Sequence, residues 1–135
     1  MPRAALLLAG AAAIAALVDL GHKATAAPAY LHGRSAGYVV LVLGLSLAWA
    51  AAIVVTRSPA MALGGGIAAG GAIGNVFSLV FWPEVPNPIE VAPIAFNLAD
   101  VFVLVGFLLV AGTTIAMAAG DRERLREPLR LRERL

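Results

Sequence analysis

Long apolar stretches, separated by short polar segments, dominate the pattern of this 135-residue chain. About 20 residues, each advancing a helix by about 1.5 Å, cross the bilayer's hydrocarbon core of about 30 Å. Four stretches are long enough: they run from Ala4 to Leu20, from Ala36 to Thr56, from Ala60 to Trp82 and from Ile94 to Gly120. A backbone in lipid must satisfy its own hydrogen bonds, so each stretch is predicted to be a helix. The expected fold is an all-α membrane protein with four transmembrane helices.

The composition agrees with this fold class. Hydrophobic residues make up 61% and charged residues 13% of the chain, against about 45–50% and about 25% in soluble domains. These values exclude a soluble enzyme, a soluble nucleic-acid-binding domain and a disordered chain. The chain has no cysteine, which excludes disulfides and thiolate metal sites. We expect no metal and no cofactor.

The basic residues predict the orientation of the chain. Arg3, Arg57 and the six arginines of the last fifteen residues fall on one side of the four stretches, and only Lys23 and Arg34 fall on the other. Because cytoplasmic loops carry the excess of basic residues, both termini are expected in the cytoplasm. A short segment after the first helix and a proline-rich loop between the third and fourth helices are then external.

The charged C-terminal residues 121–135 are predicted to form a cytoplasmic tail, separate from a transmembrane domain of residues 1–120. Acidic residues alternate with the arginines of this tail and cancel much of its positive field. For that reason we do not expect nucleic acid as a partner.

The first stretch has a second interpretation. Arg3, an Ala/Leu-rich run and the small residues Ala24-Thr25-Ala26 resemble a secretory signal with its cleavage site. Asp19 and Lys23 between the run and that site are unusual for such a signal, and its removal would place the charged tail outside. We therefore favour an uncleaved first helix.

Glycines are dense in the third stretch. Gly66, Gly70 and Gly74 recur every four residues, so they form a bare stripe along one helix face. A phosphate-binding loop would need a strand before the helix, which a transmembrane span lacks. The stripe predicts close packing against another helix.

Polar side chains are few in the apolar stretches and occur in pairs three or four residues apart. The pairs are Asp19 with Lys23, Asn75 with Ser78, and Asn97 with Asp100. Each pair shares one helix face, and all three lie near the external ends of their helices. We expect the helices to bring them together in a pocket that opens outward, where ionisable groups are functional candidates. A structural ion pair between Asp19 and Lys23, and interhelical hydrogen bonds from the two asparagines, remain open alternatives.

The external segment from Trp82 to Pro93 contains four prolines, which predict an irregular, extended course. It is expected to be either a lid over the pocket or a simple connector. Asp100 follows it, among apolar neighbours, and an unpaired carboxylate in such surroundings suits acid–base chemistry.

Three segments together resemble motifs of the bacterial lipoprotein signal peptidase family, signal peptidase II. They are Gly71-Ala72-Ile73-Gly74-Asn75, Phe96-Asn97-Leu98-Ala99-Asp100 and Asp19-x-x-x-Lys23, the last being similar to the family's Asp-Gln-x-x-Lys. The resemblance implies a multi-pass protein of the bacterial inner membrane that removes signal peptides from lipid-modified prolipoproteins. It also implies two aspartates that share a water at the outer leaflet. One carboxylate activates the water while the other, protonated, polarises the scissile carbonyl.

The catalytic pair implied by this resemblance is incomplete. One aspartate corresponds to Asp100, and the other is expected three residues after the asparagine of Gly-Asn-x-x-Asp-Arg, where this chain has Ser78. A serine hydroxyl cannot share a proton with Asp100. The family's Val-Val-Asp-Phe stretch is similar to Pro88-Ile89-Glu90-Val91, with three extra residues before it. Glu90, or Glu84 on the same loop, could therefore act as a surrogate acid.

The leading hypothesis is a pseudoenzyme of this family that has lost or weakened its proteolysis. It is expected to bind a membrane lipid, a lipidated prolipoprotein or another membrane protein at the outer leaflet. The candidate binding residues are Asp19, Lys23, His32 (where the family has an asparagine), Arg34, Asn75 and Asn97. Two alternatives stay open: an active aspartyl peptidase that uses Glu84 or Glu90, and a small structural or assembly subunit of a membrane complex.

Overall fold

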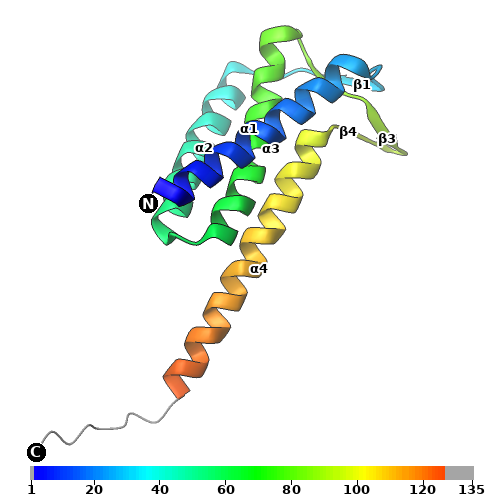
Figure 1. The fold of residues 1–135 in the computed structure, drawn as a ribbon. Helices are drawn as coiled ribbons and strands as arrows, with labels where there is room; N and C mark the ends of the chain where they lie inside the picture. Colours follow the sequence, from blue (N-terminus) through cyan, green and yellow to red (C-terminus); the bar gives the residue numbers. More distant parts are fainter. Residues whose placement is uncertain (1, 127–135) are drawn as a thin grey trace, which may run out of the picture.

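The computed structural model describes residues 2–126, and four long helices dominate it (Figure 1). The helices are α1 (Pro2–Thr25), α2 (Ala36–Thr56), α3 (Pro59–Phe81) and α4 (Leu98–Arg126). Each contains a stretch of 21 to 23 residues that is apolar enough to cross a membrane. The prediction of four membrane-length helices is confirmed. The first residues of the expected tail continue α4, and the rest of the tail lies outside the described residues.

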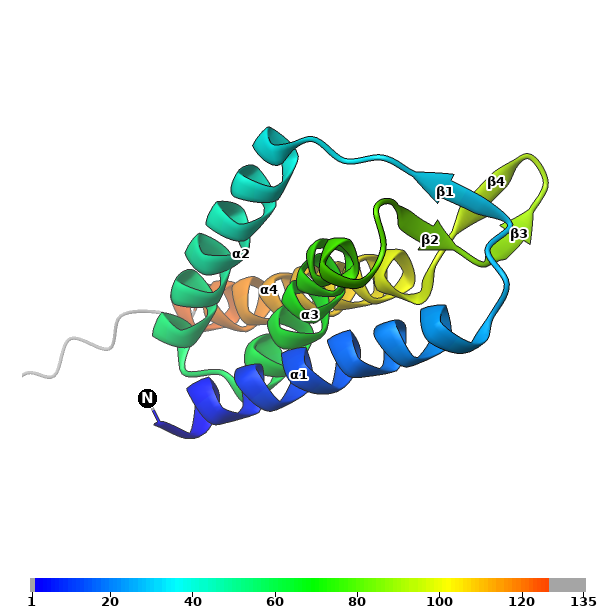
Figure 2. The ribbon, with the colours of Figure 1, turned by 90° about the horizontal axis from the view of Figure 1, so that it is seen from above.

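α3 is the central helix (Figure 2). The other three helices each pack mainly against α3 and touch one another much less. In the most apolar part of α3, 61% of the residues are buried, whereas the other three helices have only 11–22% buried. α1, α2 and α4 therefore turn most of their apolar surface outward, as helices in contact with lipid do.

The glycines of α3 allow this close packing. The stripe at Gly66 and Gly70 faces α1, and a Cβ on Gly70 would lie 2.7 Å from the Cα of Ala12. Gly64 faces α4 instead, where a Cβ would lie 2.9 Å from the Cβ of Leu109. Both distances are shorter than atoms tolerate, so only glycine fits. The prediction that these glycines serve helix packing is confirmed.

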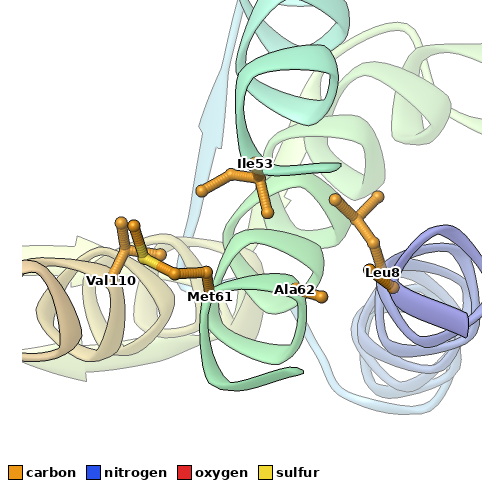
Figure 3. Close-up of a cluster of buried hydrophobic side chains, with 6 residues drawn as sticks. Leu8, Ile53, Met61, Ala62 and Val110 are labelled. Atoms are coloured by element: carbon orange, nitrogen blue, oxygen red, sulfur yellow. The ribbon is translucent and has the colours of Figure 1, made fainter. Parts of the chain in front are cut away.

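An apolar core lies at the end of the molecule where α2 turns into α3 (Figure 3). All four helices contribute to it. Its buried members are Ala4 and Leu8 of α1, Ile53 of α2, Met61 and Ala62 of α3, and Val110 of α4. None of these core residues is ionisable, whereas the buried Asp19 and Lys23 lie near the opposite end of α1.

The segments that link the helices at that opposite end form two antiparallel strand pairs. β1 (Tyr30–His32) pairs with β2 (Val85–Asn87), and β3 (Ile89–Val91) pairs with β4 (Ile94–Phe96). The proline-rich loop is extended, as predicted, but it is not irregular, because its residues pair as strands. The fourth helix begins at Leu98 and not at Ile94, because the apolar residues of β4 pair with β3.

Candidate functional site

The ammonium group of Lys23 lies at the centre of a buried polar cluster near the strands. It donates hydrogen bonds to Asp19 Oδ2 at 2.6 Å, to Asn75 Oδ1 at 2.8 Å and to Ser78 Oγ at 2.9 Å. All four side chains belong to residues that are at most 4% exposed. A protonated lysine has three donors and no acceptor. The cluster therefore satisfies the charged form of Lys23 completely.

Asp19 connects the cluster to α4. Its second oxygen, Oδ1, accepts a hydrogen bond from the backbone N–H of Ala99 at 2.8 Å. This N–H belongs to the first turn of α4, where helix donors lack intrahelical partners. The carboxylate also lies at the positive end of the helix dipole. The ion pair of Asp19 with Lys23 is thus present, and it joins α1 to α3 and α4.

Asn97 and Asp100 form a reciprocal pair at the first turn of α4. Asn97 Oδ1 accepts from the backbone N–H of Asp100 at 3.1 Å, and Asp100 Oδ2 accepts from the backbone N–H of Asn97 at 3.2 Å. This arrangement is a capping box. Asp100 Oδ1 accepts from Asn75 Nδ2 at 3.0 Å, so the amide of Asn75 links Asp100 to Lys23. Asp19 is buried and Asp100 is exposed, so Asp100 is the acid of this network that a ligand can reach.

Ser78 belongs to the Lys23 cluster. Its hydroxyl accepts from Lys23 and donates to the backbone carbonyl of Gly74 at 2.8 Å, and the residue is fully buried. Among the described residues, no hydrogen bond joins Ser78 to Asp100. The surroundings of Ser78 are those of a structural acceptor for the ammonium.

A residue that the sequence analysis did not select, Asn87 at the end of β2, lies beside the capping box. Its Oδ1 accepts a hydrogen bond from Asn97 Nδ2 at 2.6 Å, and the residue is 6% exposed. β1 holds it in place, since Ala29 N–H donates to the carbonyl of Asn87 at 3.1 Å and Tyr30 is its strand partner. Asn87 is therefore fixed close to the first turn of α4.

A signal for Asn87 was present in the sequence. The family's Val-Val-Asp-Phe stretch aligns with Glu90 only if three extra residues precede it. Without this insertion the acid position falls on Asn87, and the first valine falls on Val85, which is fully buried.

The remaining candidates lie outside this hydrogen-bond network. Glu90 is exposed on β3, and Glu84, just before β2, lies beside Gly33, just after β1. His32 is exposed on β1, and Arg34 places its guanidinium 4.5 Å from the centre of the Tyr38 ring. Within the part of the chain that the structure describes, none of these four side chains is hydrogen-bonded to the Lys23 cluster or to the capping box. That part also contains no group of three His, Asp or Glu side chains that could hold a metal ion.

Four membrane-length helices, three of which are joined by a buried polar cluster, define a multi-pass membrane protein. The family model described as signal peptidase (SPase) II matches residues 23–116, which include Lys23, Asn87 and the capping box. The chain belongs to the signal peptidase II family. No curated protein and no solved structure matched it.

Proposed function

We propose that this chain is a signal peptidase II homologue that binds the lipid-modified segment of a prolipoprotein but has lost, or nearly lost, the ability to cut it. The proposal rests on the identity of the side chain that lies beside the capping box of Asn97 and Asp100. At that place the chain has the amide of Asn87, and a second carboxylate is missing.

The chemistry of an aspartyl peptidase depends on two carboxylates that share a proton. The amide of Asn87 has nearly the same shape as a carboxylate, so it keeps the hydrogen bond from Asn97. It has no acidic proton to share with Asp100, and it cannot act as a base. The geometry of the site is thus retained while the acid–base pair is lost.

Ser78 and Lys23 do not offer a nucleophilic substitute. A serine–lysine pair requires a neutral lysine that takes the hydroxyl proton. Here Lys23 Nζ is already bonded to the carboxylate of Asp19 at 2.6 Å, and the Ser78 hydroxyl already donates to the carbonyl of Gly74. Ser78 is also fully buried, so no scissile carbonyl reaches it.

The proposal places the strands and the site at the outer face of the bacterial inner membrane, with both termini in the cytoplasm. The distribution of basic residues supports this orientation. Arg57 lies in the turn between α2 and α3, at the end of the molecule opposite Lys23 and Arg34, and Arg3 lies at the start of α1. Cytoplasmic ends carry the excess of such residues.

The test is cleavage of a diacylglyceryl-modified prolipoprotein by the full chain in detergent, beside a family member with both aspartates. We expect the wild-type chain to bind this substrate without cutting it. Asn87→Asp is expected to create cleavage, because it puts a second carboxylate next to the Asp100 capping box. This gained activity should disappear when Asp100→Asn is added. Ser78→Asp is the matched control and should create none, because its carboxylate would face Lys23.

Cleavage by the wild-type chain that depends on Asp100 would overturn the proposal. Glu84→Gln and Glu90→Gln would then identify the surrogate acid. Absence of substrate binding would also overturn it, and would favour a role as an assembly subunit.

A further inference from the structure

Arg34, in the segment between β1 and α2, has a buried guanidinium nitrogen without an acceptor. Its Nε is buried and has no hydrogen-bond partner among the described residues. Within the same residues the one ion pair is that of Lys23 with Asp19, so Arg34 is not paired with a carboxylate, including Glu84 beside the neighbouring Gly33. A donor that leaves water without gaining an acceptor is unfavourable. The guanidinium is therefore free to bind an anion from outside this part of the chain.

Tyr38 holds this guanidinium in place. The Arg34 Cζ lies 4.5 Å from the centre of the Tyr38 ring, the geometry of a cation–π contact. The position of Tyr38 is fixed in turn, because Ser35 caps α2 and its Oγ accepts a hydrogen bond from the backbone N–H of Tyr38 at 3.2 Å. A guanidinium that is already positioned loses less freedom when its N–H groups bind an anion.

The length of α2 places Arg34 at the level of the lipid headgroups. α2 has 21 residues, with Arg34 two residues before its start and Arg57 directly after its end. A helix of this length just crosses the hydrocarbon core of about 30 Å, so both arginines lie where that core ends. The segment that carries Arg34 runs from β1 to α2 along the edge of the molecule (Figure 2), where lipid can approach it. The anions at this level are the phosphate groups of phospholipids.

We propose that Arg34 binds the phosphate group of a membrane phospholipid. The paired N–H groups of a guanidinium match two phosphate oxygens, and the ring of Tyr38 supports the guanidinium from the other side. A free phosphate ion offers the same oxygens but lacks the acyl chains that would lie along α2, so we assign the site to lipid. The proposal requires only that α2 spans the membrane. It holds in either orientation, and it is independent of whether the protein binds or cuts a prolipoprotein.

The test is lipid binding by the full chain, measured by native mass spectrometry from detergent after gel filtration shows that each variant elutes like the wild type. The probes are dioleoyl phosphatidylglycerol, dioleoylglycerol, which has the same acyl chains without the phosphate, and inorganic phosphate. Arg34→Gln removes the guanidinium. Arg34→Lys keeps the charge but not the paired N–H groups, and it carries the test if Arg34→Gln does not fold. Arg57→Gln is the matched control, since Arg57 is an exposed arginine at the other end of α2.

We expect Arg34→Gln to bind phosphatidylglycerol about tenfold more weakly than the wild type, because it loses charge-assisted hydrogen bonds. Arg34→Lys should lose less, and Arg57→Gln should bind like the wild type. Binding of dioleoylglycerol should be the same for all four proteins. Unchanged binding of phosphatidylglycerol by both Arg34 variants, or an equal loss in Arg57→Gln, would overturn the proposal. If inorganic phosphate displaces the lipid from the wild type, the ligand is a free phosphate ion and the assignment to lipid is wrong.

Discussion

Lys23 illustrates how much one side chain determines in this protein. Taking an ammonium and a carboxylate out of water costs several kcal/mol for each ion. The 2.6 Å contact with Asp19, together with the bonds to Asn75 and Ser78, offsets that cost. The same ammonium thereby holds one end of α1 against one end of α3. Removing one member of such a buried ion pair therefore costs more stability than removing both members together.

Replacing Lys23 alone is therefore expected to be severe. Lys23→Met leaves the buried carboxylate of Asp19 uncompensated and should lower the free energy of unfolding by about 3–5 kcal/mol. Adding Asp19→Asn to this variant should recover part of the loss, since the amide oxygen still accepts from Ala99. Denaturant unfolding in detergent, followed by tryptophan fluorescence, measures both variants and Asp19→Asn alone. If the two single losses simply add in the double variant, the two residues are not coupled and this account of the cluster is wrong.

Among the elements, α3 has the most demanding position, because three other helices pack against it. Its glycines reduce the helix to little more than its backbone on the sides that face α1 and α4. The polar half of the helix, with Asn75 and Ser78, can then reach Lys23 and Asp100 directly. Close packing near the middle of α3 is thus what brings the polar groups within hydrogen-bonding distance at its end.

A single methyl group should disturb this packing. Gly70→Ala pushes a Cβ to 2.7 Å from the Cα of Ala12 and should lower the free energy of unfolding by about 1–3 kcal/mol, as overpacked cores do. Gly112→Ala on α4 is the control, because nothing lies within 4 Å of a Cβ there. We expect it to leave stability unchanged. Thermal unfolding in the same detergent compares the two, and an equal effect of both changes would argue against the packing role of Gly70.

Hydropathy was sufficient to predict the helices but not the strands in the segments between them. The bounds of α2 agree with the predicted range of 36–56, because polar residues frame this apolar run on both sides. The start of α4 was placed too early, since Ile94–Phe96 is as apolar as the helix that follows. A strand of three residues has no periodicity of its own, and its partner lies elsewhere in the chain.

In the candidate site, too, residues on helices were predicted and a residue held by strand pairing was missed. Helical spacing predicted that Asp19, Lys23, Asn75, Ser78, Asn97 and Asp100 would face one another, and the hydrogen bonds join them into one network. Asn87 was missed because β1, which is more than fifty residues earlier in the chain, holds it in place. Long-range strand pairing of this kind leaves little trace in a local pattern.

For the molecule as a whole, the two ends differ in character. One end has an apolar core of side chains from all four helices, and the other has the polar network and the strands. The proposed orientation puts the apolar end toward the cytoplasm and the network toward the outer leaflet. In that orientation the exposed carboxylate of Asp100 lies on the side of the membrane that the proposed substrate, a lipid-modified prolipoprotein, would approach.

Labelling of intact cells tests this orientation. Gly33→Cys, in the exposed segment after β1, should react with a membrane-impermeant maleimide added outside spheroplasts. Gly120→Cys, exposed far along α4 from the strands, should react only after the membrane is permeabilised. The excess of basic residues near the cytoplasmic ends is the physical reason. The opposite labelling pattern would invert the topology and remove the site from the outer leaflet.

α4 follows the other three helices in the sequence, and this order has a consequence for synthesis. A growing chain releases its N-terminal helices first, so Lys23 can meet Asp19, Asn75 and Ser78 before α4 exists. Until α4 arrives, Asp19 Oδ1 lacks the N–H of Ala99 and Asn75 Nδ2 lacks the carboxylate of Asp100. A chain interrupted after α3 would keep these polar atoms without these partners. The arrival of α4 thus completes the network.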